Sequence, residues 1–296
     1  MTKPSHASSL PAPGRAINPL AAAIEFARSA LVDFLHKVVY RRVRSRTQVT
    51  SDYDLGQWSD ELHARGWEKC ANLDDYLLHR KAKPMKALVN GRLTRLSASE
   101  YYTYRTKLLA DVLAEESAGS DTLIELGSGT GRNLFTLSQT GHWKRLTGLE
   151  LSSTGRDVLR SIAGHFKVQN VDCERIDLLD PQSEGFARLK GATVFTFYCL
   201  EQLPSYTEKV LRNLAEAGVK RVIHIEPTLE LFHWWSIRDL ATIMYVWRQD
   251  YQRTLVRSVS ALEQAGIARV KKVRRLNFAP TCRNDPTLIV WDPVQR

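Results

Sequence analysis

The sequence has no long apolar run, few cysteines and little apolar character in its first residues. Its apolar stretches fall far short of the roughly 20 residues that a membrane-spanning helix needs, so we expect no integral membrane protein. The four cysteines lie far apart without a Cys-x-x-Cys pair, which argues against a disulfide scaffold or a cysteine zinc site: Cys70, Cys173, Cys199 and Cys282. Residues 1–18 show no apolar core behind a basic start, so we expect no secretory signal. We therefore predict a cytoplasmic protein, with membrane association left open.

Metal-binding patterns are also missing. The eight histidines form no His-x-x-x-His or comparable pair, so we predict no metal site. The 296 residues are 43% apolar and 25% charged, with a mean hydropathy of −0.30, and this composition excludes a disordered or collagen-like chain. The length suits one large α/β domain with extensions, or two small domains.

The net charge of +10 is unevenly spread along the chain. Residues 1–50 carry 8 basic and 2 acidic side chains, and residues 251–296 carry 9 and 3, so each end is +6. The middle, 51–250, carries 25 basic and 27 acidic side chains and is net −2. The basic ends indicate a possible nucleic-acid or other anionic partner, whereas the middle does not.

Three regions are expected: a flexible leader with a basic amphipathic helix (1–50), a helical extension (51–118) and a main α/β domain (119–296). Residues 5–19 are rich in Ser, Pro and Ala, which is typical of a flexible leader. Residues 20–46 have one apolar stripe at helical spacing and a basic end, formed by Ile24, Ala27, Leu31, Phe34, Leu35 and Val38, then Lys37, Arg41, Arg42, Arg44 and Arg46. The helix has three interpretations: a solvated face with a tail, an interfacial helix on a peripheral membrane or protein partner, or a nucleic-acid arm.

The rest of the extension predicts helices. Residues 52–95 have apolar anchors at Trp58, Leu62, Trp67, Tyr76, Leu77 and Leu88, and we expect a helical region there. Residues 100–116 predict a clearer helix, with Tyr101, Tyr104, Leu108 and Val112 on one face.

From residue 121 onward, short apolar runs alternate with helical segments. Strands are expected at 121–126, 145–151, 171–178, 192–198 and 220–226, and helices at 133–139, 154–166, 180–190 and 206–217. The last of these helices opens with a capping-box sequence, Ser205 to Glu208. After a long helical stretch (229–266), the runs 268–278 and 287–291 predict an antiparallel hairpin. The fold class is therefore α/β: a doubly wound, mostly parallel Rossmann-like sheet with a C-terminal hairpin and an N-terminal helical extension.

The sharpest signal is the glycine-rich turn after the first strand of this sheet. It reads Glu125-Leu-Gly127-Ser128-Gly129-Thr-Gly131-Arg132-Asn133. Glycines permit positive φ and close approach of a ligand, and the N–H groups at the following helix start suit a carboxylate or phosphate. A dinucleotide fingerprint needs its third glycine at position 132, which is Arg132, so the spacing disfavours an NAD enzyme.

This Glu-x-Gly-x-Gly-x-Gly sequence resembles motif I of class I S-adenosylmethionine (SAM)-dependent methyltransferases. The resemblance covers roughly residues 119–296 and implies that the turn wraps the amino-acid end of SAM, with Glu125 beside its cationic group. It further implies that Glu150, ending the second strand, accepts the ribose hydroxyls, and that Asp177 and Leu178 meet the adenine. The segment 195–204 is similar to the family's fourth-strand motif, with Gln202 in place of a histidine, so proton transfer at that position is in doubt.

Four residues at strand ends are candidates for catalysis. Glu226 ends the fifth strand and His224 points to the same face, so the two could act as an acid/base pair, or else cap a helix and fill the core. Glu201 supports the site or simply starts a helix, and Tyr198 lies where the family's residues line the methyl-transfer region. The thiol of Cys199 is expected to be a small buried group.

Aromatic residues on both sides of the motif are further candidates. Tyr104 and Arg105 precede the sheet and could reach the SAM carboxylate, or pack as a core stripe. The aromatic residues of 232–235, with Tyr245, Trp247 and Tyr251, could wall an acceptor pocket or simply pack helices.

We predict a SAM-dependent methyltransferase whose N-terminal helical extension covers the acceptor site and which acts on an oxygen or nitrogen atom of a small molecule, such as a sugar or a lipid-linked metabolite. The alternatives are an RNA methyltransferase, suggested by the basic ends, and a non-catalytic SAM-fold interaction protein. The RNA alternative is weakened because neither an Asn/Asp-Pro-Pro-Tyr/Phe sequence nor a Pro-Cys pair is present.

Overall fold

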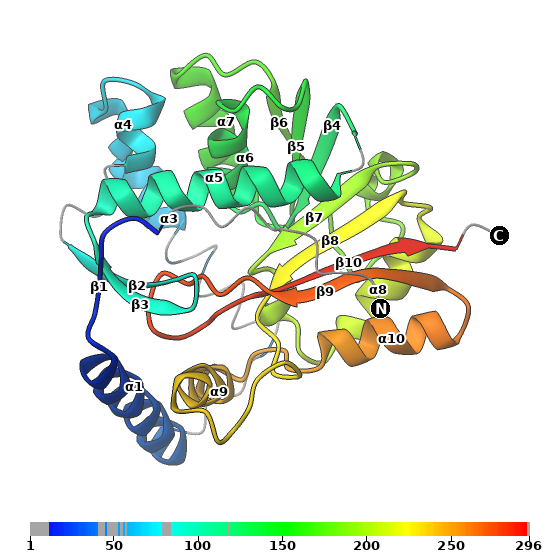
Figure 1. Cartoon of the computed structure of the whole chain (residues 1–296). Coiled ribbons are helices and arrows are strands. Elements are labelled where there is room, and N and C mark those ends of the chain that lie inside the picture. The colour runs from blue at the N-terminus through cyan, green and yellow to red at the C-terminus, as the bar shows by residue number, and fades with distance from the viewer. Residues whose placement is uncertain are drawn as a thin grey trace.

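The computed structural model describes residues 12–40, 45, 53, 56, 58–78, 84–117 and 119–294. A seven-stranded sheet with the order β6-β5-β4-β7-β8-β10-β9 runs through the molecule (Figure 1). Its strands are β4 (Thr122–Leu126), β5 (Arg145–Glu150), β6 (Val171–Arg175), β7 (Thr193–Phe197), β8 (Arg221–Glu226), β9 (Ala268–Arg275) and β10 (Thr287–Pro293). The first five pair in parallel, and β10 lies antiparallel between β8 and β9. The predicted doubly wound sheet and terminal hairpin are both confirmed.

Helices cover both faces of this sheet, as a buried parallel sheet requires. One face packs on α5 (Ala98–Glu116), α6 (Arg132–Ser138) and α7 (Ser153–His165). The other packs on α8 (Thr207–Glu216), α10 (Leu255–Gln264) and the short 3₁₀ helix η3 (Glu184–Arg188). Fully buried leucines such as Leu134 and Leu211 join these helices to the sheet, and each contributes about 1.5–3 kcal/mol through burial.

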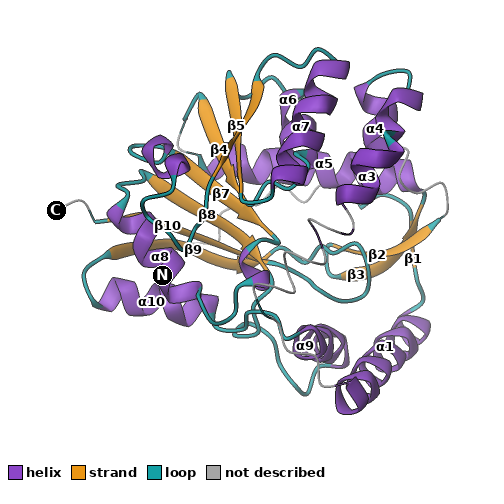
Figure 2. Cartoon of the chain, turned by 180° about the vertical axis from the view of Figure 1, so that it is seen from behind, coloured by secondary structure: helices purple, strands orange, loops and turns teal. Residues whose placement is uncertain are grey.

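A second, smaller layer lies beside the carboxyl ends of the central strands. The three-stranded sheet β1-β3-β2 consists of β1 (Arg15–Ala16), β2 (Met85–Val89) and β3 (Arg92–Leu96). The helices α1 (Pro19–Tyr40) and α9 (Ile237–Gln249) lie side by side at the periphery of the molecule (Figures 1 and 2). Between α1 and α5 the chain forms α3 (Trp58–Ala64), η2 (Gly66–Lys69) and α4 (Leu73–Leu78).

The prediction of helix throughout 52–95 is wrong for its last part. Residues 85–96 form the antiparallel hairpin of β2 and β3. Asn90 and Gly91 occupy its two-residue turn with φ values of 49° and 78°, and an Asn-Gly pair is the strongest short sequence signal for such a turn. The leader also ends earlier than expected, because Arg15 and Ala16 pair with β3.

Helix boundaries differ from the prediction in three places. Residues 180–190 contain only η3, and Gly185 inside this stretch disfavours a longer helix. The capping box at 205–208 does not form: α8 begins at Thr207 without a side-chain cap, whereas a complete capping box joins Ser97 and Glu100 at the start of α5. The stretch 229–266 holds two helices, α9 and α10, with irregular segments before each. The basic end of the predicted helix 20–46 beyond Tyr40 lies outside the described residues, except Ser45.

Among the described helices, none combines the length and the apolar character that crossing a membrane requires.

Candidate cofactor cavity and catalytic residues

A cavity of about 300 Å³ opens at the carboxyl ends of β4, β5, β6 and β7. The chain order reverses between β4 and β7, and this switch point is where ligands bind in open α/β sheets. Its lining residues come from the four strand ends and from the N-terminal extension: Tyr53, Trp58, Gly127, Leu149, Glu150, Leu151, Ser152, Ile176, Asp177, Leu178, Leu179, Tyr198, Cys199, Gln202 and Leu203. The volume is at the lower end of the range for small-ligand pockets.

The three glycines of the turn have different structural roles. All have positive φ, but Gly127 is the one that lines the cavity, and a Cβ there would lie 2.2 Å from the Cys199 sulfur. A Cβ on Gly129 would meet the Trp58 ring at 3.0 Å. Gly131 caps α6, and a Cβ there would lie 2.6 Å from the Leu159 side chain. The predicted glycines are therefore required for the turn's backbone shape and for its close packing.

Glu150 ends β5 at the cavity, where the sequence prediction placed a ribose-binding acid. Its carboxylate accepts hydrogen bonds from the backbone N–H groups of Gly129 and Ser152, both at 2.8 Å. The carboxylate is almost fully buried, and this burial raises its pKa. Glu150 thereby joins the glycine turn to the start of α7 at the cavity wall.

Asp177 and Leu178 follow β6 and also line the cavity. The Asp177 carboxylate accepts the N–H of Leu179 at 3.1 Å, and the Asp177 N–H donates to the Ser183 hydroxyl at 2.9 Å. With Ile176 beside them, these residues form a mostly apolar wall with one acid.

Glu125 and Asn133 lie next to the cavity but not on its wall. The Asn133 amide donates to Glu125 at 2.5 Å, and the Arg105 guanidinium donates to the Asn133 carbonyl oxygen. Burial raises the pKa of Glu125 to about 8. The second carboxylate oxygen of Glu125 and the Ser128 hydroxyl are buried and accept no hydrogen bond from the described part of the chain. The structure thus brings Arg105, Asn133 and Glu125 into one row.

Tyr104 does not join this row. Its hydroxyl donates to the Asn90 side chain at 2.6 Å, and its ring packs 5.5 Å from that of Phe278. This geometry favours the alternative of core packing for Tyr104, and its contact with SAM stays a prediction.

Two aromatic residues of the N-terminal extension cover the cavity, and the sequence prediction did not place them there. Tyr53 and Trp58 line it with ring centroids 5.2 Å apart. A Cβ on Gly129 or on Gly155 would contact the Trp58 ring, which shows how closely it covers the glycine turn. Helical spacing identified Trp58 as an apolar anchor, but no local pattern indicates which surface it covers.

Tyr198 follows β7 on the cavity wall in a left-handed backbone conformation, with φ of 54°. A tyrosine in this region is uncommon, and such strain gathers at functional sites. Its hydroxyl donates to the backbone carbonyl of Asn284 at 2.8 Å, and burial raises its pKa well above the usual value. Tyr198 therefore connects the cavity with the loop between β9 and β10.

His224 is a core histidine, so its predicted catalytic role is wrong. Its Nε2 accepts the indole N–H of Trp291 at 3.1 Å, so the other ring nitrogen, Nδ1, faces the Thr196 hydroxyl at 3.0 Å as the donor. The ring is fully buried, and this burial lowers its pKa to about 3. A ring with both nitrogens engaged and no solvent access cannot exchange a proton with a substrate.

Glu226 is fully buried and supports the turn after β7, as in the capping alternative. Its carboxylate accepts the backbone N–H of Cys199 at 2.9 Å and that of Glu201 at 3.3 Å. Burial raises its pKa to about 7, and hydrogen bonds from Thr196 and from these N–H groups oppose the rise. Glu226 is a positioning residue here, and its predicted role as catalytic base is not supported by this geometry.

Glu201 and Gln202 lie in this supported turn. The Gln202 amide donates to the Glu201 carboxylate at 2.9 Å and to the Tyr53 hydroxyl at 3.3 Å. Gln202 lines the cavity, whereas Glu201 lies behind it and is joined to it by this hydrogen bond. The Gln202 amide, at the position where the family has a histidine, thus joins the turn after β7 to Tyr53 of the N-terminal extension.

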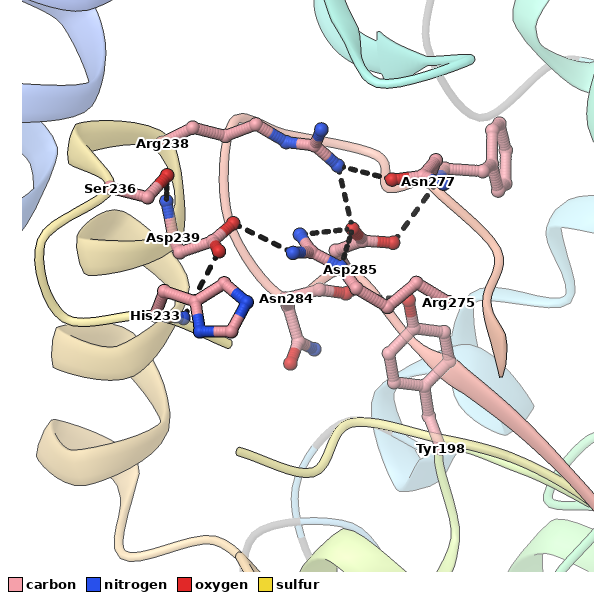
Figure 3. A network of polar contacts seen from close by, with 10 residues as sticks. Tyr198, His233, Ser236, Arg238, Asp239, Arg275, Asn277, Asn284 and Asp285 are labelled. Atoms are coloured by element: carbon pink, nitrogen blue, oxygen red, sulfur yellow. Dashed lines mark hydrogen bonds and ion pairs between the residues drawn. The ribbon is translucent and has the colours of Figure 1, made fainter. Parts of the chain in front are cut away.

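A buried ion-pair network joins the start of α9 to the end of β9 and to the loop between β9 and β10 (Figure 3). Arg275 at the end of β9 lies between the carboxylates of Asp239 and Asp285, at 2.8 and 2.9 Å. Arg238 also donates to Asp285 at 3.0 Å and to Asn277 at 2.6 Å. The Phe232 ring lies 3.9 Å from the Arg275 guanidinium, which places one of the predicted aromatic residues in this network. Among the described residues, no three His, Cys, Asp or Glu side chains form a group that could hold a metal ion.

When the chain is compared with known proteins, only the comparison with solved structures finds similar proteins. No protein-family model and no curated protein matches the chain. Magnesium protoporphyrin IX methyltransferase from Synechocystis PCC 6803 with bound SAH is 13% identical, with 67% of this chain and 87% of that chain covered and a TM-score of 0.48. An O-methyltransferase family protein from Burkholderia thailandensis and the pyocyanin biosynthetic protein PhzM are each 17% identical, with TM-scores of 0.47. The matches cover 64% and 65% of this chain, and 56% of each of those chains.

The strand order, the antiparallel β10 and the glycine turn after β4 together form a doubly wound, mostly parallel Rossmann-like fold.

Proposed function

We propose that this chain is a methyltransferase that uses SAM and transfers the methyl group to an oxygen or nitrogen atom of a small-molecule acceptor. The observation that carries the proposal is the cavity at the carboxyl ends of β4 to β7, which combines a glycine turn, a buried acid at the end of β5 and an acid after β6. The resemblance implies a cofactor contact at each of these strand ends, and this supports the proposal.

The residues present fit this cofactor, which is a cation that carries a ribose and an adenine ring. The Glu150 carboxylate would accept the ribose hydroxyls, and Asp177 with Leu178 would contact the adenine. The second oxygen of Glu125 accepts no hydrogen bond from the described residues, and an ammonium group bound beside it would stabilise the ionised form that burial disfavours. Gly127 leaves space that a side chain would fill.

The bound cofactor supplies an electrophilic methyl group on a sulfonium. The protein must then hold the acceptor in line and exclude water. Tyr53 and Trp58 cover the cavity and would exclude water, while Tyr198 forms the wall beside Gly127. The Glu226 carboxylate holds the backbone of the turn from Cys199 to Glu201 in one position.

A hydroxyl or ammonium acceptor must also lose a proton, and we propose Glu201 for this step, although it lies behind Gln202 and does not itself line the cavity. With His224 and Glu226 engaged in the core, Glu201 is the remaining carboxylate among the four predicted catalytic residues. Its Oε1 is oriented by the Gln202 amide, which itself reaches the cavity. General-base catalysis of this kind accelerates a reaction by about 10²–10⁴-fold.

The test is an acceptor screen with SAM carrying a radiolabelled methyl group. Pools of sugars, sugar nucleotides, phenols, amines and lipid-linked sugars are compared with total RNA as acceptors. We expect transfer to a small-molecule pool, and Glu201→Gln should lower turnover by on the order of 10²-fold or more while leaving the affinity for S-adenosylhomocysteine (SAH) unchanged. The control Glu208→Gln changes an exposed acid on α8 and should retain full activity.

Two results would contradict parts of the proposal. Transfer to RNA alone would make the small-molecule acceptor wrong. Binding of SAH without transfer to any pool would favour the non-catalytic interaction protein.

A further inference from the structure

The helix α1 presents its apolar side to solvent. Its exposed stripe follows helical spacing, and each side chain is between 52% and 71% exposed: Leu20, Ile24, Leu31, Leu35 and Val38. Val39 and Tyr40 at the end of the helix are also exposed, each 68%, although Tyr40 lies on another side of the helix than the stripe. A scattered exposed leucine needs no explanation, but a continuous apolar stripe marks an interaction surface.

The side of α1 that packs on the protein is, by contrast, mostly small or polar. Its buried residues are Ala22, Phe26, Ala30 and Asp33. Asp33 is fully buried and pairs with Arg248 at 3.1 Å and with Arg283 at 2.6 Å. The helix is thus attached through close packing on α9 and through ion pairs, while the larger aliphatic side chains take little part in the fold.

The acidic side chains of α1 face the body of the protein, as its small side chains do. Both acids of α1 engage basic partners on the body of the protein: Asp33 as described, and Glu25 with Lys86 at 2.7 Å. Arg28 keeps a side chain that is 72% exposed. Directly after the helix the sequence continues with Arg41, Arg42, Arg44 and Arg46, and no Asp or Glu occurs between Asp33 and Asp52.

We propose that the exposed stripe of α1 binds the surface of a bilayer that contains anionic lipids, to which the basic residues that follow in the sequence are attracted. An interfacial helix of this kind buries an apolar stripe at the boundary of the acyl chains while its basic residues meet anionic headgroups. The helix α1 lies at the periphery of the molecule (Figures 1 and 2), and the side chains of its stripe are exposed.

Two other occupants fit the same surface less well. A nucleic acid would be met by basic side chains on the exposed face, and that face is aliphatic. A second copy of α1 would cover the stripe, but it would add a second basic segment and no anionic partner. An anionic bilayer accounts for both the apolar stripe and the basic segment.

The test is co-sedimentation of the full chain with vesicles of phosphatidylcholine containing phosphatidylserine, and with vesicles of phosphatidylcholine alone. We expect binding to the anionic vesicles that weakens at high salt. The double variant Leu31→Glu with Leu35→Glu should lower the partition coefficient by on the order of tenfold or more. Its matched control, Leu78→Glu with Val294→Glu, adds the same charge at exposed apolar positions outside α1 and should bind as the wild type does.

Two further double variants test the apolar contact and the electrostatic attraction separately. Their thermal unfolding shows whether the fold is retained. Leu31→Gln with Leu35→Gln removes the apolar contact without new charge, and Arg41→Gln with Arg42→Gln removes basic charge alone. Each should weaken vesicle binding while thermal unfolding stays that of the wild type. The proposal is overturned if the wild type does not bind anionic vesicles, or if the Leu31 and Leu35 variants bind as tightly as the wild type. It is also overturned if the stripe instead holds a lipid-independent dimer, which these variants convert to a monomer.

Discussion

The two halves of the sheet's carboxyl edge are built in different ways. At the ends of β4, β5 and β6, the cavity wall consists of residues within a few positions of a strand end, such as Gly127, Glu150 and Asp177. Beside β7, β8 and β10, the structure depends on contacts between distant segments. There Asp285 binds Arg238, and Tyr198 binds Asn284, 86 residues further along the chain.

This difference shows how the fold separates two tasks. The first half, which we call the glycine-turn half, offers backbone N–H groups and carboxylates to a ligand of fixed shape. The second half, the network half, holds the Tyr198 turn and the β9–β10 loop in place through buried charge and hydrogen bonds. Changes in the first should therefore alter cofactor binding, and changes in the second should alter stability.

Loss of the central carboxylate of the network should have the largest effect. Asp285→Ala leaves Arg275 and Arg238 without their shared buried partner, and breaking a buried ion pair costs about 3–5 kcal/mol. We expect this decrease in the free energy of unfolding in urea. Asp157→Ala, which breaks an exposed pair with Arg160 on α7, should leave the unfolding midpoint unchanged. Equal midpoints for the two variants would mean that the network does not stabilise the fold.

In the glycine-turn half, the strongest effect should come from Glu150. Glu150→Ala removes the carboxylate proposed to bind the ribose, and we expect a loss of SAH affinity of about 100-fold, or about 2.7 kcal/mol. Isothermal titration calorimetry measures this loss, with Asp172→Ala as the control because Asp172 is an exposed acid on the adjacent β6. An unchanged affinity in Glu150→Ala would exclude Glu150 from the cofactor site.

The buried histidine of the network half should give a pH dependence of stability. The folded pKa of His224 is about 3, well below the 6.5 of an unfolded chain, so the unfolded state binds the extra proton between these values. The contribution of His224 is fully present above pH 6.5 and is lost as the pH falls toward 3, at about 1.4 kcal/mol per pH unit. Relative to His224→Gln, the wild type should lose stability by this slope between pH 6.5 and 4.5 in urea titrations. Parallel curves for the two proteins would contradict the assigned burial.

The smallest effect should come from the link between the two halves. Tyr198→Phe removes the hydrogen bond to the Asn284 carbonyl and should lower the free energy of unfolding by about 0.5–1.5 kcal/mol. The ring remains on the cavity wall, so SAH affinity should stay that of the wild type. A large loss of affinity would instead make the hydroxyl a ligand of the cofactor.

Sequence reasoning reached the glycine-turn half because its geometry is local. The spacing of Gly127, Gly129 and Gly131 after an apolar strand fixes a turn and the start of a helix, and acids at strand ends must lie at the same edge. The hairpin of β2 and β3 could have been found as well, since Asn90 and Gly91 carry its turn signal.

The roles of His224 and Glu226 and the orientation of α1 could not be predicted in this way, because they depend on contacts between segments that are distant in the sequence. The pattern around His224 and Glu226 is the same for a catalytic pair and for a buried support, and the Trp291 and Cys199 partners decide between them. Helical spacing likewise located the apolar stripe of α1 but not the side to which it turns.

Calorimetry of the wild-type protein with SAH, SAM and NAD tests the central claim most directly. The account predicts that SAH and SAM bind with a stoichiometry of one, that NAD does not bind, and that Gly129→Val abolishes binding while cooperative unfolding is retained. Binding of NAD without SAM or SAH would contradict it.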